Sequence, residues 1–161
     1  MTTVVADQGR KIIVADSLVT APGQASYLSS KLYRANGAIF GEAGDTEAYM
    51  RFRRWQLDGA TKKDRPKFTD ANDFSVLELC KDGLFLWDWA MARERIKDEI
   101  YSIGSGADIA LYCARVLKHP AERCVYEATK IDRNSLPPVE RLTLKGGEEP
   151  ETVPVSETEG I

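Results

Sequence analysis

The first residues of the chain carry two groups that could act together in catalysis. The sequence begins Met1-Thr2-Thr3-Val4, and removal of Met1 would leave Thr2 with a free α-amine beside its own β-hydroxyl. A hydroxyl is a poor nucleophile near neutral pH unless a base accepts its proton. An α-amine has an unperturbed pKa of about 7.7–8.0 and can be that base. We therefore consider an N-terminal threonine nucleophile, against the alternative of an ordinary chain start that leads into a strand.

Other residue types exclude several competing kinds of site. His119 is the single histidine of the chain, so neither a Ser-His-Asp triad nor a histidine-rich metal centre is expected. Cys80, Cys113 and Cys124 have no metal-ligand spacing. Their apolar surroundings favour buried free thiols in a reducing compartment. We expect no metal and no cofactor.

Length and charge narrow the class of protein further. With 161 residues, 43% of them hydrophobic and 29% charged, the chain is long enough for one domain with a sizeable core. A net charge of -3 offers no electrostatic case for binding nucleic acid or an anionic membrane. No apolar run approaches the roughly 20 residues that span a bilayer, and the start lacks the features of a signal peptide. A cytoplasmic globular protein is expected.

The elements that must position a site follow from periodicity and turn residues. Strands are predicted at residues 2–6, 11–15, 31–34, 38–44, 74–80, 84–87, 100–103 and 139–144. Helices are predicted after the capping pair Asp45-Thr46 as far as residue 57, over residues 107–117, and from Pro120 to residue 131. Residues 18–30 and 61–72 are predicted loops, and residues 90–98 have no clear pattern.

This order of elements predicts the fold class and the domain limits. Hairpin-linked strands form antiparallel sheets, and the helices must cover the outer faces of those sheets. A four-layer α-β-β-α sandwich of the α+β class satisfies the order, with the domain over residues 1–145. From residue 146 the chain has two prolines, five glutamates and little bulk. Residues 146–161 are therefore predicted to be a flexible acidic tail.

Six segments together resemble the proteasome β-subunit family, most closely its bacterial HslV-like threonine peptidases. They are Thr2-Thr3-Val4-Val5, Val14-Ala15-Asp16-Ser17, Ser30-Lys31-Leu32-Tyr33, Gly41-Glu42-Ala43-Gly44-Asp45, Ile103-Gly104-Ser105-Gly106 and Asp132-Arg133-Asn134-Ser135. Each segment alone is common, and their order over residues 2–144 makes the resemblance specific. The chain departs from the pattern at Ala15, usually glycine, and at Leu136-Pro137-Pro138, where a glycine usually follows the serine. The resemblance implies the N-terminal-nucleophile hydrolase fold.

The resemblance also implies the roles of three charged or nucleophilic residues. Thr2 matches the nucleophile, and Asp16 matches the acid that holds the active-site lysine. Lys31 matches that lysine, whose charge lowers the pKa of the amine or hydroxyl and helps to orient the threonine.

Four further positions match the supporting residues of the family. Ser105 matches the serine that hydrogen-bonds the terminal amine, and Asp132 and Ser135 match the pair below the nucleophile. The backbone N–H of Gly41 matches the donor that stabilises the tetrahedral oxyanion. Each of these residue types, taken singly, also suits a helix cap, a turn or a solvated strand position.

The activity that the resemblance implies is a threonine-type endopeptidase that hydrolyses unfolded polypeptides inside a homo-oligomeric ring. The chain has no Gly-x-x-x-x-Gly-Lys-[Ser/Thr] motif, so an ATP-driven AAA+ unfoldase would be a separate partner. Two alternatives remain open: a catalytically silent proteasome-like scaffold, and an amidase of the same superfamily acting on a small amide.

Overall fold

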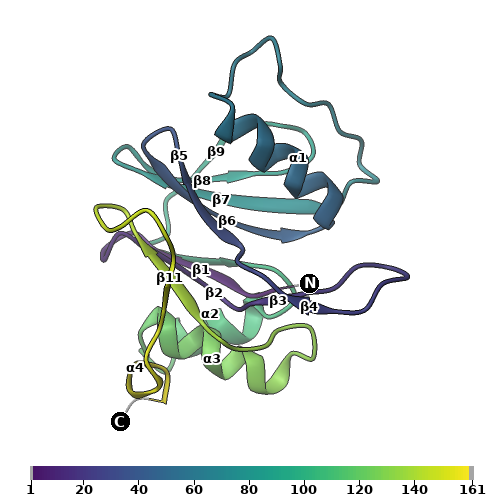
Figure 1. The fold of residues 1–161 in the computed structure, drawn as a ribbon. Coiled ribbons are helices and arrows are strands. Elements are labelled where there is room, and N and C mark those ends of the chain that lie inside the picture. The colour runs from purple at the N-terminus through teal and green to yellow at the C-terminus, as the bar shows by residue number, and fades with distance from the viewer. Residues whose placement is uncertain (1, 160–161) are drawn as a thin grey trace.

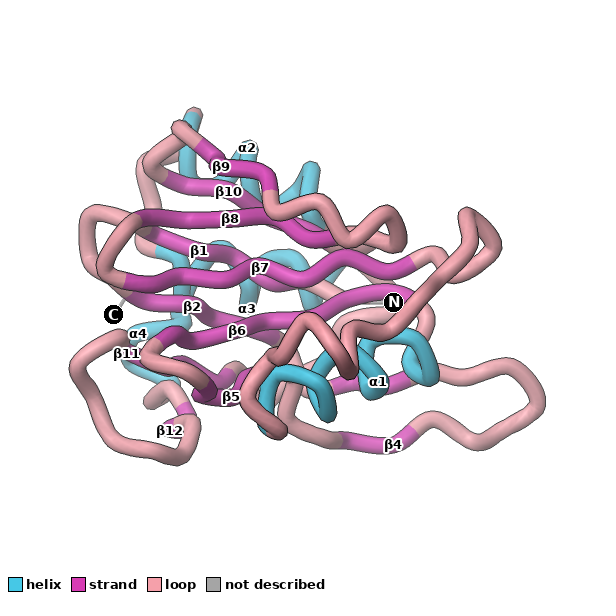
Figure 2. The backbone as a smooth tube through the Cα atoms, turned by 90° about the horizontal axis from the view of Figure 1, so that it is seen from above, coloured by secondary structure: helices cyan, strands magenta, loops and turns pink. Residues whose placement is uncertain are grey.

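The computed structural model describes residues 2–159 and arranges them in four layers (Figure 1). Two five-stranded antiparallel sheets stack face to face, with α1 on the outside of one sheet and α2 and α3 on the outside of the other. The strands of the two sheets run in similar directions when seen from above (Figure 2), as in aligned sheet packing. The predicted α-β-β-α sandwich is confirmed.

The first sheet has the strand order β10-β1-β2-β11-β12. Its strands are β1 (Val4–Asp7), β2 (Ile12–Ala15), β10 (Ile100–Ile103), β11 (Glu140–Thr143) and β12 (Glu151–Thr152). Helices α2 (Ala107–Arg115) and α3 (Ala121–Ile131) cover its outer face. Small residues such as Ala110 and Ala121 pack there against Val5 and Val14, which lets both helices approach the sheet closely.

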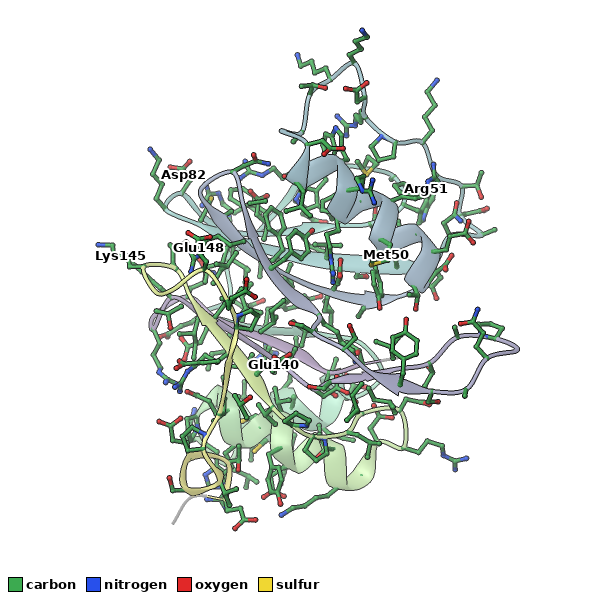
Figure 3. All side chains as sticks on the ribbon, viewed as in Figure 1. Met50, Arg51, Asp82, Glu140, Lys145 and Glu148 are labelled. Atoms are coloured by element: carbon green, nitrogen blue, oxygen red, sulfur yellow. The ribbon has the colours of Figure 1, made fainter. Side chains whose placement is uncertain are left out.

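The second sheet has the strand order β5-β6-β7-β8-β9. Its strands are β5 (Leu32–Ala35), β6 (Ala38–Gly44), β7 (Phe74–Cys80), β8 (Gly83–Trp87) and β9 (Glu94–Ile96). Helix α1 (Thr46–Leu57) begins after Asp45, whose side chain accepts a hydrogen bond from the Glu47 N–H, as predicted for an N-cap. Phe52 anchors α1 among buried aromatic rings of this sheet, whereas Met50 and Arg51 of the same helix are exposed (Figure 3).

The alternation of side chains along β6 separates two cores. Ile39 and Ala43 belong to the apolar cluster between the sheets, together with Val4 and Ile13 of the first sheet. Phe40 lies on the opposite face, in the aromatic cluster under α1. A strand between two packed layers is buried on both faces, so a charged residue of β6 has no route to water. Glu42 is in that position and is fully buried.

Several predicted elements differ in detail from the structure. The predicted loop over residues 18–30 contains a small two-stranded sheet of β3 (Leu18–Val19) and β4 (Tyr27–Leu28). Pro120 is the N-cap of α3 rather than its first residue. Cys113 and Cys124 are buried free thiols as predicted, but Cys80, the last residue of β7, is only half-buried and lies beside Arg93. No helix within residues 2–159 is long and apolar enough to cross a membrane.

The predicted tail is the largest difference between sequence expectation and structure. Residues 151–159 form β12 and the short helix α4 (Val155–Glu159), which packs on α3. Val153 and Thr158 are buried, and the loop that carries Lys145 and Glu148 joins this segment to β11 (Figure 3). Residues 151–159 thus have regular structure and buried side chains within the segment 146–161 that the sequence predicts to be a flexible tail. Composition did not indicate these contacts because Arg141, which pairs with Glu151 and Glu157, lies outside the segment.

Candidate active site

The first hairpin brings Thr2 and Thr3 to Asp16. In the register of β1 and β2, Val4 lies opposite Ala15. The next pair beyond the strands is therefore Thr3 and Asp16, and the Asp16 N–H donates to the Thr3 carbonyl at 3.1 Å. Antiparallel pairing thus places the predicted nucleophile beside the predicted acid. Met1, whose removal the prediction requires, lies outside the described residues.

Asp16 is the centre of the site. Its Oδ1 accepts hydrogen bonds from Thr2 Oγ1 at 3.1 Å, from the Thr3 N–H at 3.0 Å and from Lys31 Nζ at 2.8 Å. Its Oδ2 accepts from the N–H groups of Leu18 at 3.1 Å and Leu136 at 3.0 Å. The side chain is fully buried. Five donors compensate the cost of burying this carboxylate.

Lys31 reaches this centre from the other sheet. It directly precedes β5, its side chain is 2% exposed, and its ammonium group pairs with Asp16. Burial lowers the pKa of Lys31, and the neighbouring Asp16 carboxylate opposes that shift only in part. A lysine in this state holds its proton less firmly than a lysine on the surface. The ammonium group and the Thr2 hydroxyl bind the same oxygen, which makes them close neighbours.

The remaining predicted side chains form a second hydrogen-bonded group next to the first. Ser105 Oγ and Ser135 Oγ both donate to Asp132 Oδ2, at 2.6 and 2.7 Å. Ser135 Oγ also lies 2.8 Å from Thr3 Oγ1. Partial burial would raise the pKa of Asp132, but hydrogen bonds from the two serines and from the Asn134 N–H together hold it below its usual value. Thr3 therefore connects this group to Asp16.

Gly104 explains why the predicted Gly-Ser-Gly turn lies at this site. Its φ is +97°, and a Cβ there would collide with the backbone carbonyl of Thr2. Only glycine combines this left-handed conformation with such a close approach. The Gly106 N–H donates to the same Thr2 carbonyl at 3.3 Å. The turn after β10 therefore packs directly on Thr2.

The backbone N–H of Gly41 does not point toward Thr2, as its predicted role as the oxyanion donor requires. It lies inside β6, between Leu32 of β5 and Leu77 of β7, and it faces the side chains of Val4 and Ile13 between the sheets. The Glu42 N–H donates toward β5, to the Lys31 carbonyl. Because successive N–H groups of a strand point to opposite edges, the Gly41 N–H points toward β7 and belongs to the sheet.

The backbone N–H of Gly44, unlike that of Gly41, is not directed at β7. By the same alternation, and because the Asp45 N–H donates to Asp73 at 2.7 Å, the Gly44 N–H points toward the β5 edge. The register that pairs Leu32 with Gly41 has ended there. Gly44 lines the same cavity as Thr2 and Lys31. Its φ is +101°, and a Cβ would collide with the Asp73 carbonyl, which explains the glycine.

The cavity at Thr2 is small and adjoins a larger hollow. It has a volume of about 10 Å³ and includes Thr20, Thr46 and Tyr49 in its wall. The adjoining hollow of about 630 Å³ shares Thr20, Gly44 and Thr46 with it.

Sequence reasoning missed three participants in this site. Thr3 and Leu136 contribute contacts to Asp16, and Gly44 replaces Gly41 at the cavity. The N–H of Leu136 lies in the segment where the chain departs from the family pattern, so nothing in that pattern indicated it. Residues 2–159 contain no group of three or more histidine, cysteine or acidic side chains that could hold a metal ion.

Comparison with known proteins identifies solved structures that have a similar fold. No protein-family model matches the sequence, and no curated protein matches it. Solved structures do match. The chain is similar to eukaryotic HslV from Trypanosoma brucei, with 22% identity, a TM-score of 0.60, and coverage of 88% of this chain and 98% of HslV.

It is also similar to BPH of Thiobacillus denitrificans, with 19% identity, a TM-score of 0.63, and coverage of 91% of this chain and 99% of BPH. The complex of the same BPH with epoxomicin gives 18% identity, the same TM-score of 0.63, and coverage of 90% and 100%. These identities are low, so the similarity is one of fold, and at that level the predicted resemblance is confirmed. The chain has the N-terminal-nucleophile hydrolase fold of HslV and BPH.

Proposed function

We propose that this chain is a threonine-type endopeptidase whose nucleophile is Thr2 after removal of Met1. The observation that carries the proposal is the contact of Thr2 Oγ1 and Lys31 Nζ with a single buried oxygen of Asp16. A hydroxyl, a lysine of lowered pKa and a fixed carboxylate are the parts that activate a threonine without histidine. The fold shared with HslV and BPH supports the same conclusion.

The reaction follows from the positions of these groups. Thr2 Oγ attacks the carbonyl carbon of a peptide bond while its proton passes to the freed α-amine. The C–N bond then breaks, the proton goes to the leaving amine, and an ester to Thr2 remains. Water, giving its proton to the α-amine, hydrolyses this ester and restores Thr2. The Lys31 charge stabilises the Thr2 oxygen as it loses its proton in the attack and again as it leaves the ester.

The tetrahedral intermediate requires a donor for its oxyanion, and we assign this role to the Gly44 N–H rather than to Gly41. The direction of that N–H and the shared cavity with Thr2 support the assignment. Loss of one such donor typically lowers the rate by about 10²- to 10³-fold. In the same scheme, Ser105, Asp132 and Ser135 support the terminal amine and the side-chain hydroxyl of Thr3.

We further propose unfolded polypeptide as the substrate and a homo-oligomeric ring as the working form. The hollow of about 630 Å³ that adjoins the Thr2 cavity offers room for a substrate, and the similarity to HslV supports a chambered assembly. An AAA+ unfoldase would be a separate partner, since the chain carries no ATP-binding motif. A silent scaffold would not require the hydrogen bonds of Asp16 to both Thr2 and Lys31. An amidase of the same superfamily would cleave small amides in preference to peptides.

The experiment that tests the proposal compares wild type with Thr2→Ala and Thr2→Ser. Intact mass first establishes that Met1 is absent from each protein, and sedimentation establishes that all three have the same assembly state. Thr2→Ala removes the attacking oxygen and is expected to lower kcat for fluorogenic peptides by roughly 10³-fold or more. Thr2→Ser keeps a hydroxyl and should retain measurable turnover.

Epoxomicin provides a second measurement, because BPH of T. denitrificans binds it. Native mass spectrometry should find the compound on wild type and not on Thr2→Ala. Equal peptide turnover by wild type and Thr2→Ala would refute the mechanism. Turnover of small amides but not of peptides would identify an amidase, and a correctly processed but inactive wild type would identify a scaffold.

A further inference from the structure

A second buried ion pair lies directly behind the site, and the mechanism above does not use it. Glu42 of β6 is fully buried, and its Oε1 accepts a hydrogen bond from the Arg53 guanidinium of α1. Within residues 2–159, Glu42 Oε2 and the nearby Tyr33 hydroxyl have no hydrogen-bond partner. Burying a carboxylate with one oxygen unbonded costs stability, and apolar residues of similar volume would pack at least as well. Stability therefore does not explain this pair.

The two residues of the pair hold the backbone on both sides of Lys31. Arg53 also donates to the Ser30 carbonyl at 3.2 Å. The Glu42 N–H donates to the Lys31 carbonyl at 3.2 Å. The Arg53 guanidinium lies 5.0 Å from the centre of the Tyr33 ring, which limits its movement. The Arg53 side chain thus holds the peptide group before the Lys31 Cα, and the backbone of Glu42 holds the one after it. The ion pair joins Arg53 to Glu42 and so connects the two contacts.

Glu42 and Lys31 are also coupled through their charges. Burial raises the pKa of Glu42 to about 8, while the charges of Arg53 and Lys31 oppose the rise. In return, a Glu42 carboxylate raises the pKa of Lys31, adding to the effects of Asp16 and Asp132. The other titratable groups that act here are Tyr33 of β5, Tyr49 of α1 and, through Tyr33, Glu78 of β7.

We propose that Glu42 and Arg53 are positioning residues, which hold the Lys31 backbone so that its ammonium group stays on Asp16 beside Thr2. The proposal rests on the proposed peptidase function for its activity measurement only. Neither residue touches the reacting atoms. Their effect on the reaction passes through Lys31.

The test compares Glu42→Gln with Glu78→Gln as a matched control. Glu78 is also a buried glutamate of this sheet, and it pairs with Arg93 and accepts from Trp87, away from the Lys31 backbone. Glu42→Gln is expected to lower kcat by roughly 10- to 100-fold, with KM changed by less than about twofold, because a small displacement of a catalytic group has such effects. Glu78→Gln should leave kcat unchanged even where it lowers the melting temperature.

The pH profile separates positioning from a purely structural effect. Above its pKa of about 8, Glu42 is charged and helps Lys31 to keep its proton. Loss of that charge should therefore move the alkaline limb of the kcat profile to lower pH in Glu42→Gln and not in Glu78→Gln. If Glu42→Gln does not fold, Arg53→Lys replaces it. This variant keeps the charge but loses the guanidinium Nη2, which donates to both the Ser30 carbonyl and Glu42, and it should lower kcat in the same way.

Carbon-13 NMR of ε-labelled lysine keeps this test independent of the peptidase proposal. The Lys31 signal is identified by its loss in Lys31→Arg, and its titration should move to lower pH in Glu42→Gln alone. If wild type has no peptidase activity, the function proposal fails while this titration still decides the positioning proposal. Wild-type titration of Lys31 in Glu42→Gln, or wild-type kcat in a folded Glu42→Gln or Arg53→Lys, would overturn it.

Discussion

Asp16 and Glu122 are both buried carboxylates in ion pairs, but their partners differ in kind. Asp16 pairs with Lys31, and both side chains are almost completely buried beside a cavity. Glu122 of α3 pairs with Arg10 and Arg141, and the Arg10 side chain is 46% exposed. Burial lowers the pKa of Lys31, whereas the hydrogen bond to Glu122 raises the pKa of Arg10.

The difference shows which of the two networks can take part in proton chemistry. A lysine with a lowered pKa can respond to charge that develops beside it, while an arginine stays protonated throughout the working range. The Glu122 network therefore serves only to hold elements together. It extends through Arg141 to Glu151 and Glu157 of the C-terminal segment, so it ties that segment to α3 and β11.

The strongest test of this contrast is Lys31→Met. Loss of the ammonium group should lower kcat for peptides by roughly 10²- to 10⁴-fold, because the Thr2 oxygen loses its supporting charge. Asp16→Asn should have a comparable or smaller effect, since it disturbs the position of Lys31. Peptide turnover is measured alongside circular dichroism, which controls for folding. A folded Lys31→Met protein with wild-type turnover would remove Lys31 from the mechanism.

The Glu122 network should show the opposite behaviour in Glu122→Gln. We expect unchanged kcat and a loss of unfolding free energy of about 1–3 kcal/mol, less than for a fully buried pair because Arg10 is half exposed. Burial would raise the pKa of Glu122, but hydrogen bonds from Arg10 and Arg141 lower it to about 2. Urea unfolding at several pH values measures both effects.

The sign of that pH dependence follows from the lowered pKa. A glutamate with a lower pKa in the folded state stabilises the protein above its unfolded value of 4.5, and that contribution is lost as the pH falls from 4.5 toward 2. Glu122→Gln should lack this part of the acid sensitivity. Equal acid sensitivity in both proteins would mean that Glu122 does not supply it.

Truncation after Gly147 should have a smaller effect on the protein than either Lys31→Met or Glu122→Gln. It removes Val153, which is 5% exposed, and the two glutamates that pair with Arg141. We expect a folded protein with wild-type kcat and about 1–2 kcal/mol less unfolding free energy, since ordering entropy offsets most of the burial. Thermal unfolding and turnover of the shortened chain provide the measurement. Wild-type stability would instead support a flexible tail, and lost turnover in a folded protein would connect the segment to the site.

Local features of the sequence were sufficient for most of the fold. Asn36-Gly37 supplies the tight turn between β5 and β6, with positive φ at both residues, and Asp45 caps α1. These are properties of a few adjacent residues, so they can be seen without the tertiary structure. The resemblance carried by the matching segments likewise implied the contact of Asp16 with Lys31, whereas the contact of Asp16 with Thr2 emerged only from the structure.

Only the tertiary structure favours Gly44 over Gly41 as the proposed oxyanion donor. Both glycines suit the same turn-like motif, but the direction of a backbone N–H depends on which strand lies on each side of β6. The contact of the Leu136 N–H with Asp16 spans 120 residues. Every residue except proline has a backbone N–H, so the residue type does not indicate such a donor. The same holds for the C-terminal segment. Its glutamates indicate disorder by composition. In the folded protein Arg141 of β11 lies between α3 and this segment and pairs with glutamates of both.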